Sequence, residues 1–142
     1  MTSVATKGIL DTSTVIVLGR IEDPATLPDE SLISAITLAE LSVGPHVARR
    51  EEDRAARQAH LQQAESDFDV LAFDAESARA FGAVAAALRA SGRKPAARAF
   101  DALIAASAIA YGLPLYSCKP ADFDAIPQLE LRAVPHPDHV QP

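Results

Sequence analysis

The sequence predicts an α/β fold in which helices cover a mostly parallel central sheet. Short apolar segments alternate along the chain with longer segments whose apolar residues recur at helical spacing. Turns rich in polar residues, Gly or Pro separate the two kinds of segment. This alternation is typical of strands joined by helical crossovers, which place the strands parallel to one another. The strand candidates are residues 8–10, 31–35, 68–73, 113–117 and 129–134.

The composition indicates one globular domain. The chain has 142 residues, which is enough for a full hydrophobic core. Its net charge of −6 argues against a general polyanion-binding surface, but it is compatible with a local basic patch. The single cysteine, Cys118, excludes an intramolecular disulfide and fits a reducing compartment. No signal peptide or membrane span is visible, so we expect a cytoplasmic protein. We predict a domain over residues 1–142, with its core at about 7–134 and a frayed tail at 135–142.

The first strand candidate is followed by a polar run. Residues 8–10 lead into Asp11-Thr12-Ser13-Thr14, and residues 15–18 continue as a helix or an extended segment, of which the capping residues favour the helix. Asp11 would lie at the carboxyl end of the strand, where open α/β sheets bind ligands. The alternative is that Asp11 or Ser13 only caps the helix.

The next helix is predicted to begin at Thr37. Thr37 and Glu40 have the spacing of a capping box, in which the glutamate reaches back to the backbone N–H of the threonine. That role competes with metal ligation by Glu40, because it turns the carboxylate away. Gly44-Pro45 is predicted to break or kink the helix. The charged segment 48–64 is predicted to form a further helix with a thin apolar seam.

A basic loop follows the fourth predicted helix. Asp74 is predicted to cap that helix, and its buried stripe is predicted to be Ala78, Phe81, Gly82, Ala85 and Leu88. The loop at residues 91–95 contains Arg93 and Lys94, and Arg98 lies beyond it. Such a loop beside carboxylates can hold the phosphates of a polyanion while the acids hold a metal ion. The alternative is an ordinary exposed loop.

The helix at residues 100–110 carries one carboxylate, Asp101, in an apolar wall. Its core-facing stripe is predicted to be Phe100, Leu103, Ile104, Ser107, Ala108 and Tyr111. A buried carboxylate is costly unless it is paired, protonated or bound to a cation. Asp101 is therefore either the ion-pair partner of Arg98 or a metal ligand. Gly112 is predicted to end the helix as its C-cap.

Four acidic residues follow predicted strands or begin the helices after them: Asp11, Glu40, Asp101 and Asp122. Crossover connections bring such positions to one edge of the sheet. Because four carboxylates there repel one another, a shared divalent cation explains them better than four separate structural roles. Oxygen ligands suit Mg²⁺ or Mn²⁺, whose bound water can hydrolyse a phosphodiester. The sequence has no zinc-type Cys/His spacing, G-x-S-x-G elbow or Walker A loop.

Four short motifs resemble those of a known family. They are Ile9-Leu10-Asp11-Thr12-Ser13, Thr37-Leu38-Ala39-Glu40-Leu41, the segment from Phe100 to Ala106, and Ser117-x-Lys119-x-x-Asp122-Phe123. Their order resembles the four acidic motifs of PIN-domain ribonucleases. The small size resembles the VapC toxins of bacterial VapBC toxin–antitoxin pairs. The resemblance extends from about Lys7 to Val134.

The resemblance implies a three-layer α/β/α PIN-like domain and Mg²⁺- or Mn²⁺-dependent endonucleolytic cleavage of RNA, often a structured RNA such as tRNA or rRNA. By position, Asp11, Glu40 and Asp101 match the family's principal acids, and Asp122 matches the fourth. Ser13 matches a hydroxyl that orients the first acid or a metal-bound water. The resemblance also implies a homodimer and inhibition by a VapB antitoxin, whose C-terminal segment covers the acidic site. Further candidates for substrate binding or for support of the acids are Ser117, Lys119, Arg93, Lys94 and Arg98.

Lys119 departs from the family's fourth motif, which usually reads Thr-x-Asn-x-x-Asp-Phe. A cation there can pair with the acids, contact a phosphate or replace part of a second metal site, so the number of metal ions and the role of Asp122 stay open. This departure supports one alternative, a catalytically silent PIN module that binds antitoxin or RNA. A phospho-acceptor receiver domain is disfavoured, because Thr12 rather than a second acid follows Asp11.

Overall fold

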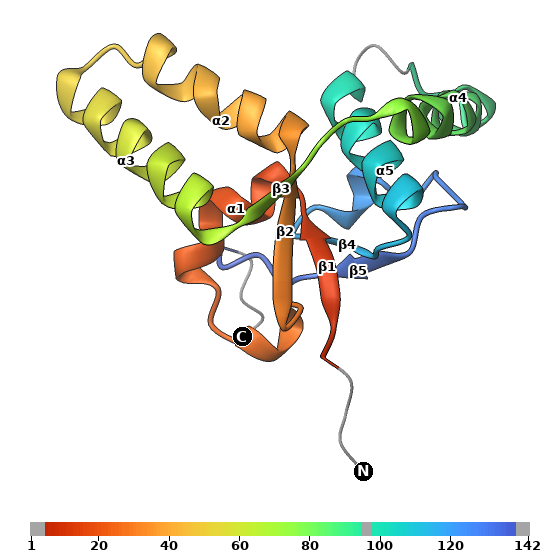
Figure 1. Ribbon diagram of the computed structural model, residues 1–142, viewed down its shortest axis with the longest axis horizontal. Helices are drawn as coiled ribbons and strands as arrows, with labels where there is room; N and C mark the ends of the chain where they lie inside the picture. The colour runs from red at the N-terminus through yellow and green to blue at the C-terminus, as the bar shows by residue number, and fades with distance from the viewer. Residues whose placement is uncertain (1–4, 95–97, 139–142) are drawn as a thin grey trace.

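The central sheet of the computed structural model has five strands, and all of its strand pairs are parallel. The structure describes residues 5–94 and 98–138. The strand order is β3-β2-β1-β4-β5, so β1 lies in the middle of the sheet (Figure 1). The strands are β1 (Lys7–Leu10), β2 (Glu30–Ser34), β3 (Asp69–Leu71), β4 (Leu115–Ser117) and β5 (Leu131–Ala133). The prediction of an α/β fold with a mostly parallel sheet is confirmed.

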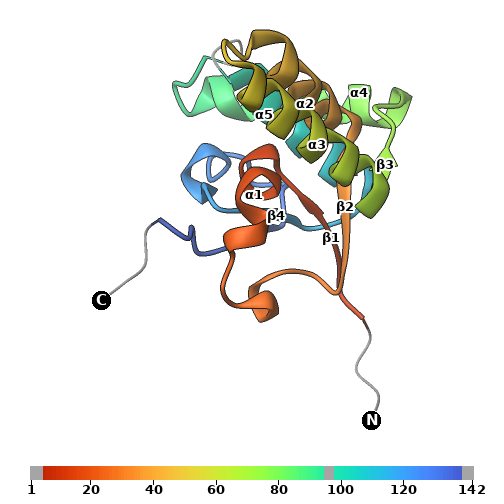
Figure 2. The same ribbon diagram turned by 90° about the vertical axis from the view of Figure 1, so that its left-hand side faces the viewer.

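Helices cover both faces of this sheet, which confirms the three-layer architecture (Figures 1 and 2). Successive residues of a strand point to opposite faces. Ile9 packs in a core with residues of α4 and α5, whereas Leu10 packs in a second core with residues of α1, α2 and α3. The helices are α1 (Thr12–Val17), α2 (Ala35–Val47), α3 (Glu51–Asp67), α4 (Ala75–Ala90) and α5 (Ala99–Tyr111). Short 3₁₀ turns are η1 (Leu18–Arg20), η2 (Pro24–Thr26) and η4 (Pro120–Asp122). Among the described residues, no helix is long and apolar enough to cross a membrane.

Helix α2 begins earlier than the sequence predicted, and the capping-box interpretation of Thr37 and Glu40 is wrong. Ser34 is the N-cap, and its side chain accepts a hydrogen bond from the backbone N–H of Ile36. Thr37 is buried inside the first turn, so Glu40 is not in a position to cap it. Pro45 does not end the helix, which continues to Val47. A proline inside a helix removes one backbone hydrogen bond and clashes with the carbonyl of the preceding turn, so packing of the buried Pro45 ring must offset this cost.

Helix α3 occupies Glu51–Asp67 rather than 48–64. Its first turn contains Glu51, Glu52 and Asp53, whose negative charges stabilise the helix by interacting with the partial positive charge at its N-terminus. Part of the predicted tail at residues 135–142 contacts the rest of the chain. Asp138 forms an ion pair with Arg20 at 2.6 Å, so the tail is held up to that point, while the remaining residues 139–142 lie outside the described part of the chain.

The buried faces of α4 and α5 differ from the predicted stripes. In α4, Ser77, Val84 and Leu88 are buried, whereas Ala78 and Gly82 are exposed. The segment is rich in alanine, so both faces of the helix have similar hydropathy and the pattern gives little contrast. The caps were predicted correctly: Asp74 accepts from the backbone N–H of Ser77, and Gly112 ends α5 at φ 66°, where glycine is favoured.

Helix α5 is buried on most of its circumference rather than along one stripe. Its buried residues include Ala102, Ala105 and Ala106, which lie outside the predicted stripe, because α5 packs against α4 as well as the sheet. Phe100, predicted to face the core, is 56% exposed in the first turn. The helix therefore exposes mainly its N-terminal turn, which carries Asp101.

Gly8 supplies a test of the packing at the centre of the sheet. A Cβ atom at Gly8 would lie 2.4 Å from Cε1 of Tyr116 and 3.3 Å from the carbonyl oxygen of Pro114. We predict that Gly8→Ala lowers the free energy of unfolding by about 1–3 kcal/mol, because the buried ring must move. The matched control is Gly82→Ala in α4, where the added Cβ atom meets nothing within 4 Å apart from the backbone of its own helix and the adjoining residues. This substitution should stabilise the protein by about 0.5–1 kcal/mol. Urea unfolding of both variants measures the difference, and equal effects would contradict the prediction.

Candidate functional site

The fold brings the four predicted acids to one edge of the sheet. Asp11 directly follows β1, and Asp122 lies in η4 after the neighbouring strand β4. Glu40 lies in the second turn of α2, after β2 on the other side of β1. Asp101 lies in the first turn of α5, a helix that ends before β4 begins and therefore starts at the carboxyl edge. The edge thus collects carboxylates that are more than 100 residues apart in the chain.

Asp11 is buried and accepts four hydrogen bonds. Its Oδ2 accepts from the hydroxyls of Ser13 at 2.9 Å and Ser117 at 2.7 Å. Its Oδ1 accepts from the backbone N–H of Thr14 at 3.0 Å and from the Thr14 hydroxyl. Asp11 is therefore the N-cap of α1, which confirms the predicted capping role of this residue. The cap occupies one oxygen, while the other lies among serine hydroxyls at the sheet edge.

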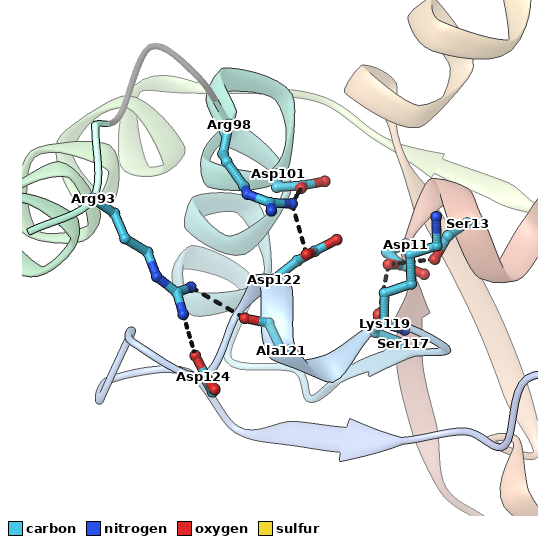
Figure 3. A network of polar contacts seen from close by, with 10 residues as sticks. All are labelled: Asp11, Ser13, Arg93, Arg98, Asp101, Ser117, Lys119, Ala121, Asp122 and Asp124. Carbon is cyan, nitrogen blue, oxygen red and sulfur yellow. Dashed lines mark hydrogen bonds and ion pairs between the residues drawn. The ribbon is translucent and has the colours of Figure 1, made fainter. Parts of the chain in front are cut away.

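Ser117 links Asp11 to the Lys119 backbone. The backbone N–H of Lys119 donates to Oγ of Ser117 at 2.9 Å, and the Ser117 hydroxyl donates onward to Asp11. The exposed side chain of Lys119 extends from this turn toward the Asp11–Ser13 end of the network (Figure 3). Ser117 is thus a positioning residue for Asp11, and Lys119 brings a positive charge to the same end of the site.

Thr12 and Thr14 belong to the site, and our sequence analysis did not single them out. The Thr12 hydroxyl donates to Oε1 of Glu40 at 2.7 Å and lies 3.0 Å from Oγ1 of Thr37. Oγ1 of Thr14 accepts from the backbone N–H of Cys118 at 3.0 Å while it contacts Asp11. The sequence feature that could have predicted their roles is the row of three hydroxyl residues after Asp11. Thr12 turns toward Glu40, whereas Thr14 turns toward Asp11.

Arg98 forms ion pairs with two of the acids. Its Nη1 lies 2.6 Å from Oδ1 of Asp122 and 3.8 Å from Oδ2 of Asp101 (Figure 3). The sequence alternative of an Arg98–Asp101 pair is therefore present, but Asp122 is the closer partner. Arg98 thus lies between the α5 and η4 acids, whereas Lys119 lies at the Asp11 end of the site.

The pKa of Asp101 is raised to about 6. Burial is the main cause, followed by repulsion from Asp122, Asp11 and Glu40, and Arg98 only partly offsets these effects. All three other acids therefore lie close enough to destabilise the charge on Asp101. This is the electrostatic situation in which an added cation is bound favourably.

The carboxylate oxygens suit Mg²⁺ or Mn²⁺ by chemical type. Within residues 5–94 and 98–138, however, no three Asp, Glu, His or Cys side chains converge closely enough to hold a metal ion as they stand. Three of the acids are instead engaged by protein groups: Asp11 accepts from four donors, Glu40 accepts from Thr12, and Asp122 pairs with Arg98. The four carboxylates therefore lie at one edge of the sheet without converging on a single point.

The basic loop only partly faces this site. Nη1 of Arg93 donates to the carbonyl oxygen of Ala121 at 3.1 Å, and its Nη2 pairs with Asp124 at 2.9 Å (Figure 3). Arg93 therefore ties the loop to η4 and points away from the acids. Lys94 is exposed, and Pro95 lies outside the described residues. Of the predicted basic candidates, Arg98 is the one with described ion pairs to the acids.

A groove adjoins the acidic edge on the α1–α3 side of the sheet. It has a volume of about 510 Å³ and begins at Thr12 and Glu40. Ile16 is 60% exposed beside it, and a second hollow shares Ile16 and His60 with the first. The remaining lining residues of the first hollow are Leu41, Gly44, Ala56 and Arg57. A largely apolar groove therefore lies beside Glu40, between α1, α2 and α3.

Together, the fold and this edge define an α/β protein with a carboxylate centre at the ends of parallel strands. The sequence pattern of the PIN domain matches residues 2–127. The chain belongs to the PIN-domain family.

Two ribonucleases are similar in sequence to this chain over most of its length. Ribonuclease VapC5 of Mycobacterium tuberculosis (strain ATCC 25618 / H37Rv) is 36% identical over 128 residues, which cover 89% of this chain and 92% of the relative. Ribonuclease VapC of Rickettsia bellii (strain RML369-C) is 32% identical over 133 residues, which cover 92% of this chain and 98% of the relative. Among solved structures, a chain of VapBC-5, a toxin–antitoxin system from Mycobacterium tuberculosis, superposes with a TM-score of 0.78. It is 34% identical, and the match covers 91% of this chain and 99% of that chain.

The raised pKa of Asp101 gives a prediction for stability. Because its folded-state pKa of about 6 exceeds the ordinary value of 3.8, the folded wild type binds more protons than the unfolded chain between these pH values. The contribution of Asp101 to stability therefore falls as pH rises from about 4 to 6. We predict that Asp101→Asn, which cannot ionise, escapes this loss and unfolds at a higher temperature than wild type at pH 8 in chelator. Thermal unfolding across pH 4–8 measures it, and a less stable variant at pH 8 would contradict the raised pKa.

Proposed function

We propose that this chain is the toxin of a toxin–antitoxin pair and acts as a metal-dependent endoribonuclease. The observation that carries the proposal is the gathering of Asp11, Glu40, Asp101 and Asp122 at one sheet edge. Support comes from relatives named ribonuclease VapC at 36% and 32% identity. The metal ion is Mg²⁺ or Mn²⁺, because the site consists of hard oxygen donors.

In this mechanism the four acids hold the metal ion. When bound, the ion supplies an activated water and stabilises the charge that develops on the phosphoryl oxygen. Described contacts of Glu40 use only Oε1, so its Oε2 is available to face the ion. The four hydrogen bonds of Asp11 fill its lone-pair positions, so one donor must turn away. Ser13 is the less buried of the two serines, and its hydroxyl is the donor that we expect to turn away from Asp11.

The basic residues complete the site for RNA. Lys119 and Lys94 are exposed, and we assign both to contacts with phosphate oxygens of the RNA. Arg93 is assigned to holding the loop rather than the phosphate, because Asp124 and Ala121 already engage it. A structured RNA such as tRNA or rRNA, implied by the family resemblance, is the substrate class that we propose.

The partner that we propose is a VapB-type antitoxin. The similar VapBC-5 structure is a member of a toxin–antitoxin family. The groove that starts at Glu40 and passes exposed Ile16 suits an apolar antitoxin segment, whose bound end would cover the carboxylates. A homodimer, which the family resemblance also implied, stays part of the proposal.

Cleavage of RNA tests the nuclease directly. We expect the purified chain to cut total cellular RNA into discrete fragments with Mg²⁺ or Mn²⁺ and not with chelator. Activity should fall below about pH 6, because protonated Asp101 binds a cation poorly. Asp101→Asn should remove cleavage while circular dichroism shows an intact fold. Wild-type activity in Asp101→Asn would contradict the site, and a folded, antitoxin-free wild type without activity would favour the silent module.

Lys119 supplies a test of the unusual fourth motif. Lys119→Asn restores the residue that the family usually carries, while the backbone N–H that donates to Ser117 is kept. We predict equal or higher cleavage rates, because an uncharged amide competes less with a metal ion. The same RNA assay measures the rate. A loss of tenfold or so would instead show that the Lys119 ammonium contacts the substrate or the reacting groups.

A further inference from the structure

Arg98 places a single guanidinium nitrogen between two proposed metal ligands. Its Nη1 contacts Asp122 at 2.6 Å and Asp101 at 3.8 Å. Figure 3 shows the side chain reaching down from the start of α5 to these carboxylates. The side chains of Asp101 and Asp122 are 31% and 23% exposed, so solvent screens the two ion pairs only in part. The carboxylates of Asp101 and Asp122 are thus both paired with a cation of the protein itself, Arg98.

Helix capping does not explain an arginine at this position. Arg98 is the N-cap residue of α5 and makes no side-chain capping hydrogen bond. Ser, Thr, Asp and Asn are favoured there because they accept a backbone N–H, and a positive charge is disfavoured at the positive end of a helix. The arginine therefore adds nothing to helix stability through its side chain. What offsets this disadvantage is the negative potential of Asp101 and Asp122.

We propose that Arg98 is an internal counter-cation that competes with the divalent metal ion for Asp101 and Asp122. This inference rests on the proposed metal site. Nη1 contacts Oδ2 of Asp101 and Oδ1 of Asp122, so a metal ion that binds these two oxygens displaces Arg98, and one that binds the other two oxygens is repelled by the guanidinium. The described side chains agree, since they do not converge on one metal position while Arg98 holds Asp122. Arg98 thereby sets the metal concentration at which the site fills.

The size of the effect follows from the exposure of Arg98. Its side chain is 47% exposed, so each ion pair is partly screened by solvent and moderate in strength. Two such pairs, together with the general repulsion between a guanidinium and a metal ion, weaken metal affinity by about tenfold. An effect of this size leaves the site functional and is large enough to measure.

Binding of Mn²⁺ alone, without RNA, tests the competition. The full chain is titrated with Mn²⁺ at pH 8, where Asp101 is ionised, and free Mn²⁺ is measured by electron paramagnetic resonance. We expect Arg98→Gln to lower the Kd for Mn²⁺ by about tenfold. The matched control is Arg93→Gln, which removes a nearby guanidinium that pairs with Asp124 instead of the site acids. Its Kd should stay within about twofold of the wild-type value.

Two further variants separate charge from shape and check the location. Arg98→Lys keeps the charge without the guanidinium and should bind Mn²⁺ no more than about threefold tighter than wild type. Adding Asp101→Asn to Arg98→Gln should abolish the gain. In parallel, Mn²⁺ should raise the unfolding temperature of Arg98→Gln more than that of wild type. This second readout also shows whether the variant is folded.

The outcomes distinguish this inference from the proposed function. Tighter Mn²⁺ binding in Arg98→Gln, with Arg93→Gln unchanged, supports the competition. Unchanged or weaker binding in a folded Arg98→Gln overturns it and leaves the metal site in place. If neither the wild type nor Arg98→Gln binds Mn²⁺, both the competition and the proposed metal site are overturned.

Discussion

Repulsion among four carboxylates at the carboxyl edge of a parallel sheet is the constraint that the surrounding side chains satisfy. Asp11 is buried and stays compatible with the fold because Ser13, Thr14 and Ser117 surround it with donors. Glu40 accepts one described hydrogen bond, from Thr12. The described contacts of Asp101 include no hydrogen bond, only the 3.8 Å ion pair with Arg98. Burial, followed by repulsion from the other three acids, raises the pKa of Asp101 to about 6.

The topology creates this constraint. Because β1 is central and its neighbours β2 and β4 are parallel to it, all three strands deliver their following residues to the same edge. Helix α5 adds Asp101 from the opposite direction, since it must start at that edge to end before β4. A site built this way depends on the whole sheet, which is why its acids come from widely separated segments.

The two cations of the site have different partners. Arg98 lies between Asp101 and Asp122, whereas the Lys119 side chain extends toward Asp11 and Ser13. Both cations reduce the negative potential that attracts a metal ion. Arg98 is the N-cap of the helix that carries Asp101, and Lys119 follows Ser117, which donates to Asp11. Arg93, in the loop after α4, instead contacts Ala121 of η4 and pairs with Asp124, so it holds that loop in place. Three nearby basic residues therefore have three different roles, which their spacing in the sequence does not distinguish.

The sequence by itself determined the α/β class, the parallel sheet, the caps Asp74 and Gly112, and the four acids with their common edge. These features follow from local chemistry: strand and helix periodicity, turn residues, and the short motifs around each acid. Only the tertiary structure decided that Thr12 donates to Glu40 and that Arg98 reaches Asp122. Each of these contacts joins side chains whose distance depends on how helices pack on the sheet. A helical period gives the direction of a side chain on its own helix, but the alanine-rich α4 and α5 leave even that direction ambiguous, and the partner across the interface is fixed only when the layers assemble.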